Sequence, residues 1–75
     1  MAHTFEDLVK LERLAEEAHA AYTANPDDGT RAAWREAADV FQAAVVEHAD
    51  AEGKSRYEVE MAAKKAVRHP EAVTS

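Results

Sequence analysis

Hydrophobic residues recur in steps of three and four along most of this chain, which is the spacing of helices with one apolar side. The first such stripe consists of Leu8, Leu11, Ala15, Ala18 and Tyr22. The second consists of Trp34, Ala37, Phe41, Ala44, His48 and Ala51, which alternate like the a and d positions of a coiled-coil seam. The pattern predicts two long helices, over residues 4–24 and 29–52, that pack against each other.

A short turn joins these two helices, because Asn25-Pro26-Asp27-Asp28-Gly29 combines a proline with residues that favour turns. So short a connection predicts an antiparallel hairpin. In the register that the turn imposes, Trp34 faces Ala18 and Phe41 faces Leu11. Large side chains then meet small ones along most of the seam, as dense packing requires.

A third, shorter helix is predicted over residues 55–68. It follows Gly53, a typical helix stop, and starts at Ser55-Arg56-Tyr57-Glu58, which matches the S-x-x-E capping box. Pro70 ends it, and residues 70–75 are expected to form a flexible tail. The sequence therefore predicts an all-α fold, an antiparallel helical hairpin plus a shorter third helix. This small three-helix bundle would form one domain over residues 1–69.

The third helix has two sides that compete for burial. One is made of small apolar residues: Val59, Ala62, Ala63, Ala66 and Val67. The other is larger and basic, and comprises Tyr57, Met61, Lys64, Lys65 and Arg68. A three-helix monomer can bury only one of them. If the small side packs inward, the remaining aromatic, methionine and basic stripe suits a partner helix or an acidic surface.

The junction between the two long helices resembles the junction between tetratricopeptide repeats. Those repeats end one helix in an alanine-rich turn, continue through proline and an acidic or amide residue, and carry a tryptophan near the start of the next helix. Pro26, Asp27, Asp28 and Trp34 play these parts here. Trp34 lies two residues too far from Pro26, and the second helix is longer than the repeat allows. The resemblance therefore indicates shared helical-hairpin chemistry rather than family membership.

Charge and composition narrow the classes of function. The net charge is −6, with residues 1–52 at −8 and residues 53–75 at +2. General nucleic-acid binders are normally basic, so direct nucleic-acid binding is disfavoured. The chain has no cysteine, no basic start followed by an apolar core, and no apolar run near the ~20 residues that cross a membrane. We expect a cytoplasmic protein that does not contact a membrane.

Residues with catalytic or metal-binding spacing are not found. The serines lack a neighbouring base, and Gly29 and Gly53 are isolated rather than clustered in a phosphate-binding loop. The histidines are never three or four residues apart. The one Glu-x-x-His pair, Glu16 and His19, is not repeated on the second helix as a di-iron bundle requires. We expect no enzyme activity, cofactor, bound metal or small-molecule substrate.

His48 occupies a seam position where an apolar residue would be expected. Because histidine titrates near neutral pH, one interpretation is a pH-sensitive switch. The alternative is a hydrogen-bonded histidine at the open end of the hairpin, half covered by Phe5.

Acidic residues define a further candidate surface. Its members are Glu12, Glu16, Glu17, Glu36, Asp39, Glu47 and Asp50. Such a surface could imitate nucleic-acid phosphates and occupy basic sites on nucleic-acid enzymes. An ordinary solvated surface, interrupted by Arg13, Arg31 and Arg35, is the simpler interpretation.

Taken together, these patterns favour a non-enzymatic interaction module or adaptor that binds another protein or itself, for example as a homodimer. Its expected contact residues are Tyr57, Met61, Lys64, Lys65 and Arg68. The alternative is a small acidic regulator of nucleic-acid machinery. It would act as a DNA mimic through the acidic residues or as a weak DNA binder through the third helix.

Overall fold

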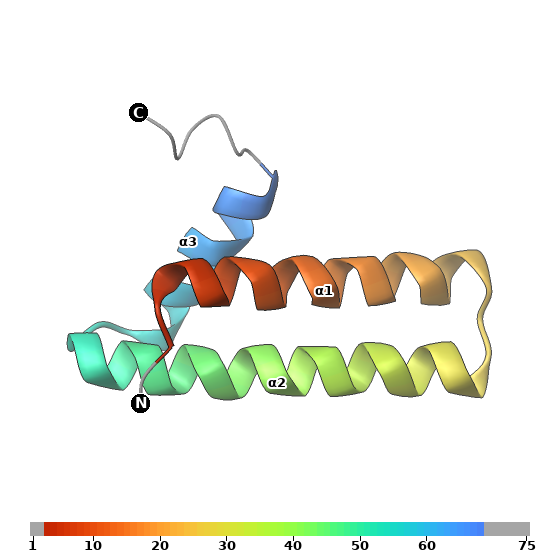
Figure 1. The fold of residues 1–75 in the computed structure, drawn as a ribbon, viewed down its shortest axis with the longest axis horizontal. Helices are drawn as coiled ribbons and strands as arrows, with labels where there is room; N and C mark the ends of the chain where they lie inside the picture. Colours follow the sequence, from red (N-terminus) through yellow and green to blue (C-terminus); the bar gives the residue numbers. More distant parts are fainter. Residues whose placement is uncertain (1–2, 69–75) are drawn as a thin grey trace.

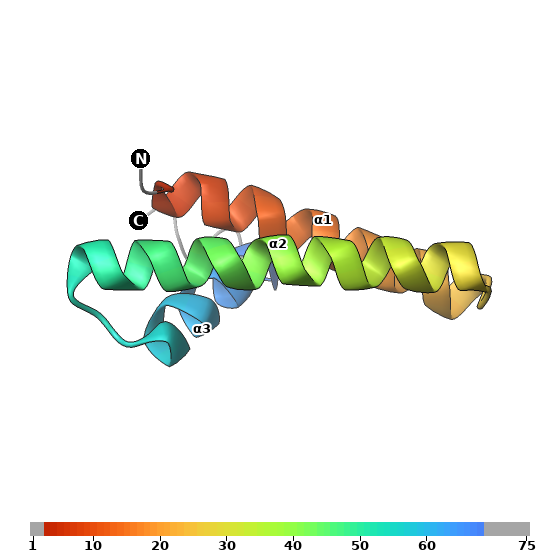
Figure 2. The ribbon, with the colours of Figure 1, turned by 90° about the horizontal axis from the view of Figure 1, so that it is seen from below.

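Three helices account for most of residues 3–68, the part of the chain that the structure describes (Figure 1). In this computed structural model α1 spans Phe5–Ala24, α2 spans Asp28–Glu52 and α3 spans Arg56–Arg68. The first two helices run antiparallel, and α3 crosses one face of their hairpin near its open end (Figures 1 and 2). The predicted all-α hairpin with a shorter third helix is confirmed.

Each helix starts on a side-chain cap. The Thr4 hydroxyl accepts from the Asp7 N–H at 3.1 Å, and the Asp7 carboxylate accepts from the Thr4 N–H at 3.1 Å. Asp27 and Thr30 form the same reciprocal box at the start of α2. The Ser55 hydroxyl accepts from the Glu58 N–H at 3.1 Å. These bonds satisfy amides that a helix start leaves unpaired, so the helix boundaries are encoded locally.

Gly53 ends α2 in the left-handed conformation, with φ 67° and ψ 32°. Its N–H points back to the carbonyls of Ala49 and Asp50, and the Lys54 N–H donates to the Ala49 carbonyl at 2.9 Å. This closure reverses the chain within a few residues. As a result, α3 folds back onto the hairpin instead of extending α2.

The core lies where all three helices meet. Its buried members are Leu8, Phe41, Ala44, Val45, Ala49, Val59 and Ala63, with Phe5 and Leu11 packed at the edge. Phe41 fills the centre, and the small Ala63 side chain lets α3 approach closely enough to cover it. The hairpin therefore depends on α3 to complete the burial of its apolar seam.

Trp34 packs against α1 at the closed end of the hairpin. Trp34 reaches the turn of α1 that contains Ala18, but its ring lies beside His19 and Tyr22, with centroid separations of 4.5 and 5.5 Å. The Trp34 ring therefore packs against two side chains that carry polar groups, the imidazole of His19 and the phenol of Tyr22.

The helix boundaries agree with the predicted ranges to within one residue. Pro70 and the predicted tail, residues 70–75, lie outside the described residues. Within the described part of the chain, none of the helices has the length and apolar character needed to cross a membrane.

Candidate functional site

The small-residue side of α3 is the buried one. Val59, Ala63 and Ala66 are packed against the hairpin, whereas Tyr57 is 73% exposed and Met61 is 43% exposed. Of the two arrangements left open by the sequence, the structure has the one that leaves the aromatic and methionine side chains facing solvent. Lys65 and Arg68 are exposed on the same side. We call Tyr57, Met61, Lys65 and Arg68 the α3 outer surface.

Lys64 differs from the other four predicted contact residues, because its side chain turns inward. Its Nζ lies 3.3 and 3.4 Å from the two carboxylate oxygens of Glu12, and 5.5 Å from the centre of the Phe41 ring. It also lies 4.0 Å from Glu60 one turn earlier on α3. Lys64 therefore fastens α3 to α1 and contributes little free charge to the α3 outer surface.

Arg68 is partly paired with α1 and partly exposed to solvent. Its Nε lies 3.9 Å from Glu16 Oε2, yet more than half of its side chain remains exposed. The guanidinium therefore keeps donors available to a partner while it neutralises Glu16.

Glu12 is only 2% exposed, so its expected place on an acidic solvated surface is wrong. It lies between Leu8 and Ala15 on the buried stripe of α1. The spacing of four and three residues from those apolar neighbours is the signal that could have identified it. Burying a carboxylate requires a nearby cation, which Lys64 supplies.

The surroundings of Glu12 also change its protonation. Burial and a hydrogen bond with Glu16 raise the pKa of Glu12 to about 7, and Lys64 opposes the shift. Glu16 Oε2 is buried and has no hydrogen-bond partner. A protonated Glu12 carboxyl is a hydrogen-bond donor within reach of this oxygen.

A groove of about 320 Å³ lies beside this carboxyl pair, between the three helices. Glu12 and Glu16 line it from α1, Trp34 and Gln42 from α2, and Lys64 and Arg68 from α3. Lys64 contacts Glu12 and Arg68 contacts Glu16, so both cations of this groove already have a partner. Its polar groups serve to hold the helices together.

His48 lies at the open end of the hairpin, as predicted. Its Nδ1 is 2.6 Å from the backbone carbonyl of His3. Since a carbonyl oxygen only accepts, Nδ1 carries the proton and donates it. Phe5 lines the same small pocket. This geometry matches the hydrogen-bonded alternative, while the pH-sensitive switch stays a prediction.

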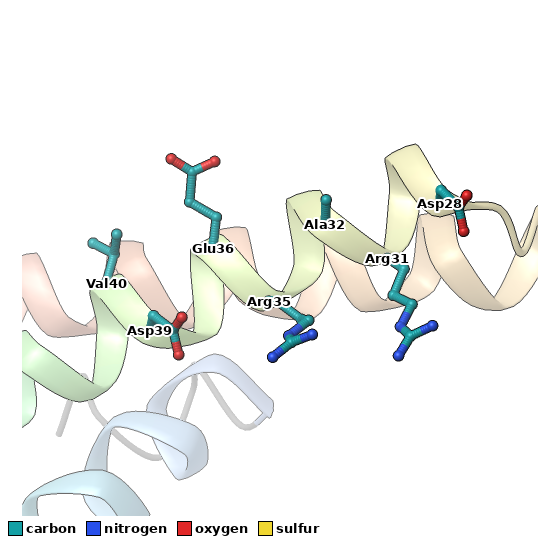
Figure 3. A pocket seen from close by; sticks show the side chains of 7 residues that line it. All are labelled: Asp28, Arg31, Ala32, Arg35, Glu36, Asp39 and Val40. Atoms are coloured by element: carbon teal, nitrogen blue, oxygen red, sulfur yellow. The ribbon is translucent and has the colours of Figure 1, made fainter.

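One exposed side of α2 carries charges of both signs, as Figure 3 shows. The pocket drawn there is lined by α2 alone, through Asp28, Arg31, Ala32, Arg35, Glu36, Asp39 and Val40. Because one convex helix provides every lining residue, this space is an open surface that does not enclose a ligand. Arg31, Arg35 and Asp39 point to one side, so the arginines interrupt the acidic residues as expected.

The hairpin carries a second apolar surface that the sequence analysis missed. Leu11 and Leu14 of α1 and Ala33, Ala37 and Val40 of α2 line a groove of about 250 Å³, with Glu36 at its edge. Leu14 is 55% exposed and Val40 is 48% exposed. Both lie off the seam, which is the signal that could have revealed them. We call this the Leu14 groove.

Among residues 3–68, no three His, Asp or Glu side chains lie close enough together to hold a metal ion. The candidate contact sites in the described part of the chain are its two exposed apolar surfaces, the α3 outer surface and the Leu14 groove. Comparisons of this chain with protein families, with curated proteins and with solved structures find no match.

Proposed function

We propose that this chain is a non-enzymatic helical interaction module that binds a protein through the α3 outer surface. The observation that carries the proposal is the exposure of Tyr57, at 73%, directly beside an exposed Met61. Tyrosine and methionine are enriched where proteins bind one another, and large apolar side chains that gather on a surface are unusual without a partner.

Charge supports the same surface. Lys65 and Arg68 flank Tyr57 and Met61, so a partner with carboxylates around an apolar centre would be complementary. Lys64 and the buried side of α3 fix this helix to the hairpin. The exposed side chains are thus presented on a rigid support, which lowers the entropy lost on binding.

The alternative function, a small acidic regulator of nucleic-acid machinery, has weaker support. A DNA mimic needs a dense exposed array of carboxylates, and this surface loses Glu12 to the interior while Arg68 neutralises Glu16. The basic residues of α3 are likewise partly engaged, because Lys64 contacts Glu12.

The proposal is tested by affinity capture from the extract of the native cells. A partner is expected to bind the wild type and to be lost with Met61→Glu or Tyr57→Ala. The expected fall in affinity is about tenfold or more, since an aromatic anchor of an interface is being removed or a charge placed beside it. The captured protein is then purified and titrated against each variant.

Val46→Glu is the matched control for this experiment. Val46 is 42% exposed, almost the same as Met61, but it lies on α2 and lines neither the Leu14 groove nor the α3 outer surface. It should bind like the wild type. Capture of the same proteins by the wild type and by both α3 variants, with helical content intact in circular dichroism, would refute the α3 outer surface as the binding site.

A further inference from the structure

The Leu14 groove and the α3 outer surface lie on opposite faces of the hairpin. Figure 3 shows Val40 and Glu36 directed away from α3, while α3 packs on the other side of α2. The residues that line the groove, among them Leu11 and Ala37, differ entirely from those that face α3, such as Ala15 and Phe41. The chain therefore presents one apolar surface on each side.

The two surfaces are complementary in shape. Alanines 33 and 37 form part of the groove wall, and their small side chains leave the space between Leu14 and Val40 open. On the α3 outer surface, Tyr57 is a large side chain that projects into solvent, and Met61 beside it lines a shallow hollow with Lys65 and Arg68. Large side chains that enter a groove lined by small ones produce the dense packing of a specific interface.

The charges around the two surfaces are also opposite. Glu36 lies at the edge of the Leu14 groove and is the charged residue among those that line it. The α3 outer surface instead carries Lys65 and Arg68. The same contrast holds over the whole chain, with −8 on residues 1–52 and +2 on residues 53–75. Opposite charges favour contact between these surfaces and disfavour contact of either surface with itself.

We propose that the partner of the α3 outer surface is a second copy of this chain, which receives Tyr57 and Met61 in its Leu14 groove. This inference rests on the proposed function, since it names the occupant of the same surface. Because the two surfaces face opposite directions, a pair of copies leaves one surface of each kind unused. The contact is head-to-tail and produces chains or rings of more than two copies.

Few side chains take part, so the contact is smaller than the ~1,200 Å² that stable interfaces bury, and association is concentration-dependent. Sedimentation of the full chain over a wide range of concentration tests it. The average mass of the wild type is expected to rise past that of a dimer. Met61→Glu places a charge on the α3 outer surface, and Leu14→Glu places one in the Leu14 groove. Each variant alone should stay monomeric.

The decisive sample is an equimolar mixture of Met61→Glu and Leu14→Glu. Each variant keeps one intact surface, so the mixture should form a one-to-one dimer and no larger species. Val40→Glu is a second groove variant, expected to match Leu14→Glu. Val46→Glu is the control and should associate like the wild type. Circular dichroism establishes that each variant keeps its helices, as expected for substitutions at exposed positions.

Three results would overturn the inference. A wild type that stays monomeric at all concentrations excludes self-association. Loss of association in Met61→Glu but not in Leu14→Glu places two α3 helices against each other. Loss in Val46→Glu places the contact on the outer side of α2. A monomeric wild type that still captures another protein through Met61 would refute this inference and leave the proposed function standing.

Discussion

Among residues 3–68, the buried carboxyl of Glu12 distinguishes the interior from a purely apolar one. It is surrounded by Glu16 on α1, Lys64 on α3 and the Phe41 ring of α2, with Arg68 in turn beside Glu16. Burial penalises the charged form, so the folded state holds a proton that the unfolded chain releases. Stability is therefore linked to pH through this group.

The sign of that linkage gives a prediction. The pKa of Glu12 rises from 4.5 to about 7 on folding. Its stabilising contribution is complete below pH 4.5 and is lost as the pH rises towards 7. Thermal melts of the wild type should show the melting temperature falling by about 5–10 °C from mildly acidic to mildly alkaline pH. Glu12→Gln cannot titrate and should remove most of this dependence. Equal pH dependence in both proteins would assign it to groups other than Glu12.

At the level of elements, the helices could be predicted and the placement of α3 could not. Thr4, Pro26, Gly53 and Ser55 act on their immediate neighbours, so a local pattern reveals them. Which side of α3 is buried depends instead on a distant contact between Ala63 and the Phe41 cluster. One side of α3 is small and apolar and the other is large and basic, and the sequence of α3 alone does not show which of them fits the hairpin.

The same reasoning explains which site residues were found. Tyr57 and Met61 could be nominated because their exposure follows from the burial of the opposite side of one helix. The inward turn of Lys64 could not, since it requires Glu12 to be buried on another helix. The Leu14 groove combines residues of two helices, so neither helix reveals it alone.

Substituting Gly53 tests whether the left-handed geometry at the end of α2 contributes to stability. Its φ of 67° is unfavourable for other residues, and an added Cβ would have nothing within 4 Å. Gly53→Ala should therefore cost about 1 kcal/mol through backbone strain alone, which lowers the melting temperature by about 4–8 °C. Gly29→Ala is the comparison, because Gly29 lacks the positive φ and an added Cβ there would meet Asp27 Oδ1 at 3.3 Å. An equal loss in both variants would show that the left-handed geometry is not what matters at Gly53.

The whole molecule is small, and its stability depends on the docking of α3. A hairpin alone would expose Leu8, Phe41 and Val45, which α3 helps to cover through Val59 and Ala63. Chains of this length bury only about 60% of their unfolded surface, so the loss of one helix removes a large share of the available stability.

Ala63→Glu is expected to break this arrangement. Ala63 is fully buried, so a carboxylate there would enter the apolar cluster without a partner. A cost of about 3 kcal/mol or more is expected, a large part of the total stability of such a domain. Ala62→Glu, at an exposed position one residue away, should change stability by no more than about 0.5 kcal/mol. Similar melting curves for the two variants would contradict the docking geometry of α3.

The side-by-side rings at the closed end of the hairpin have a practical consequence. Trp34 is the single tryptophan of the chain, and its ring contacts α1 through His19 and Tyr22. Its fluorescence therefore reports separation of α1 from α2, whereas far-ultraviolet circular dichroism reports helix content in all three elements. When both are followed in one melt, a fluorescence change at a higher temperature than the loss of helix content would distinguish release of α3 from opening of the hairpin.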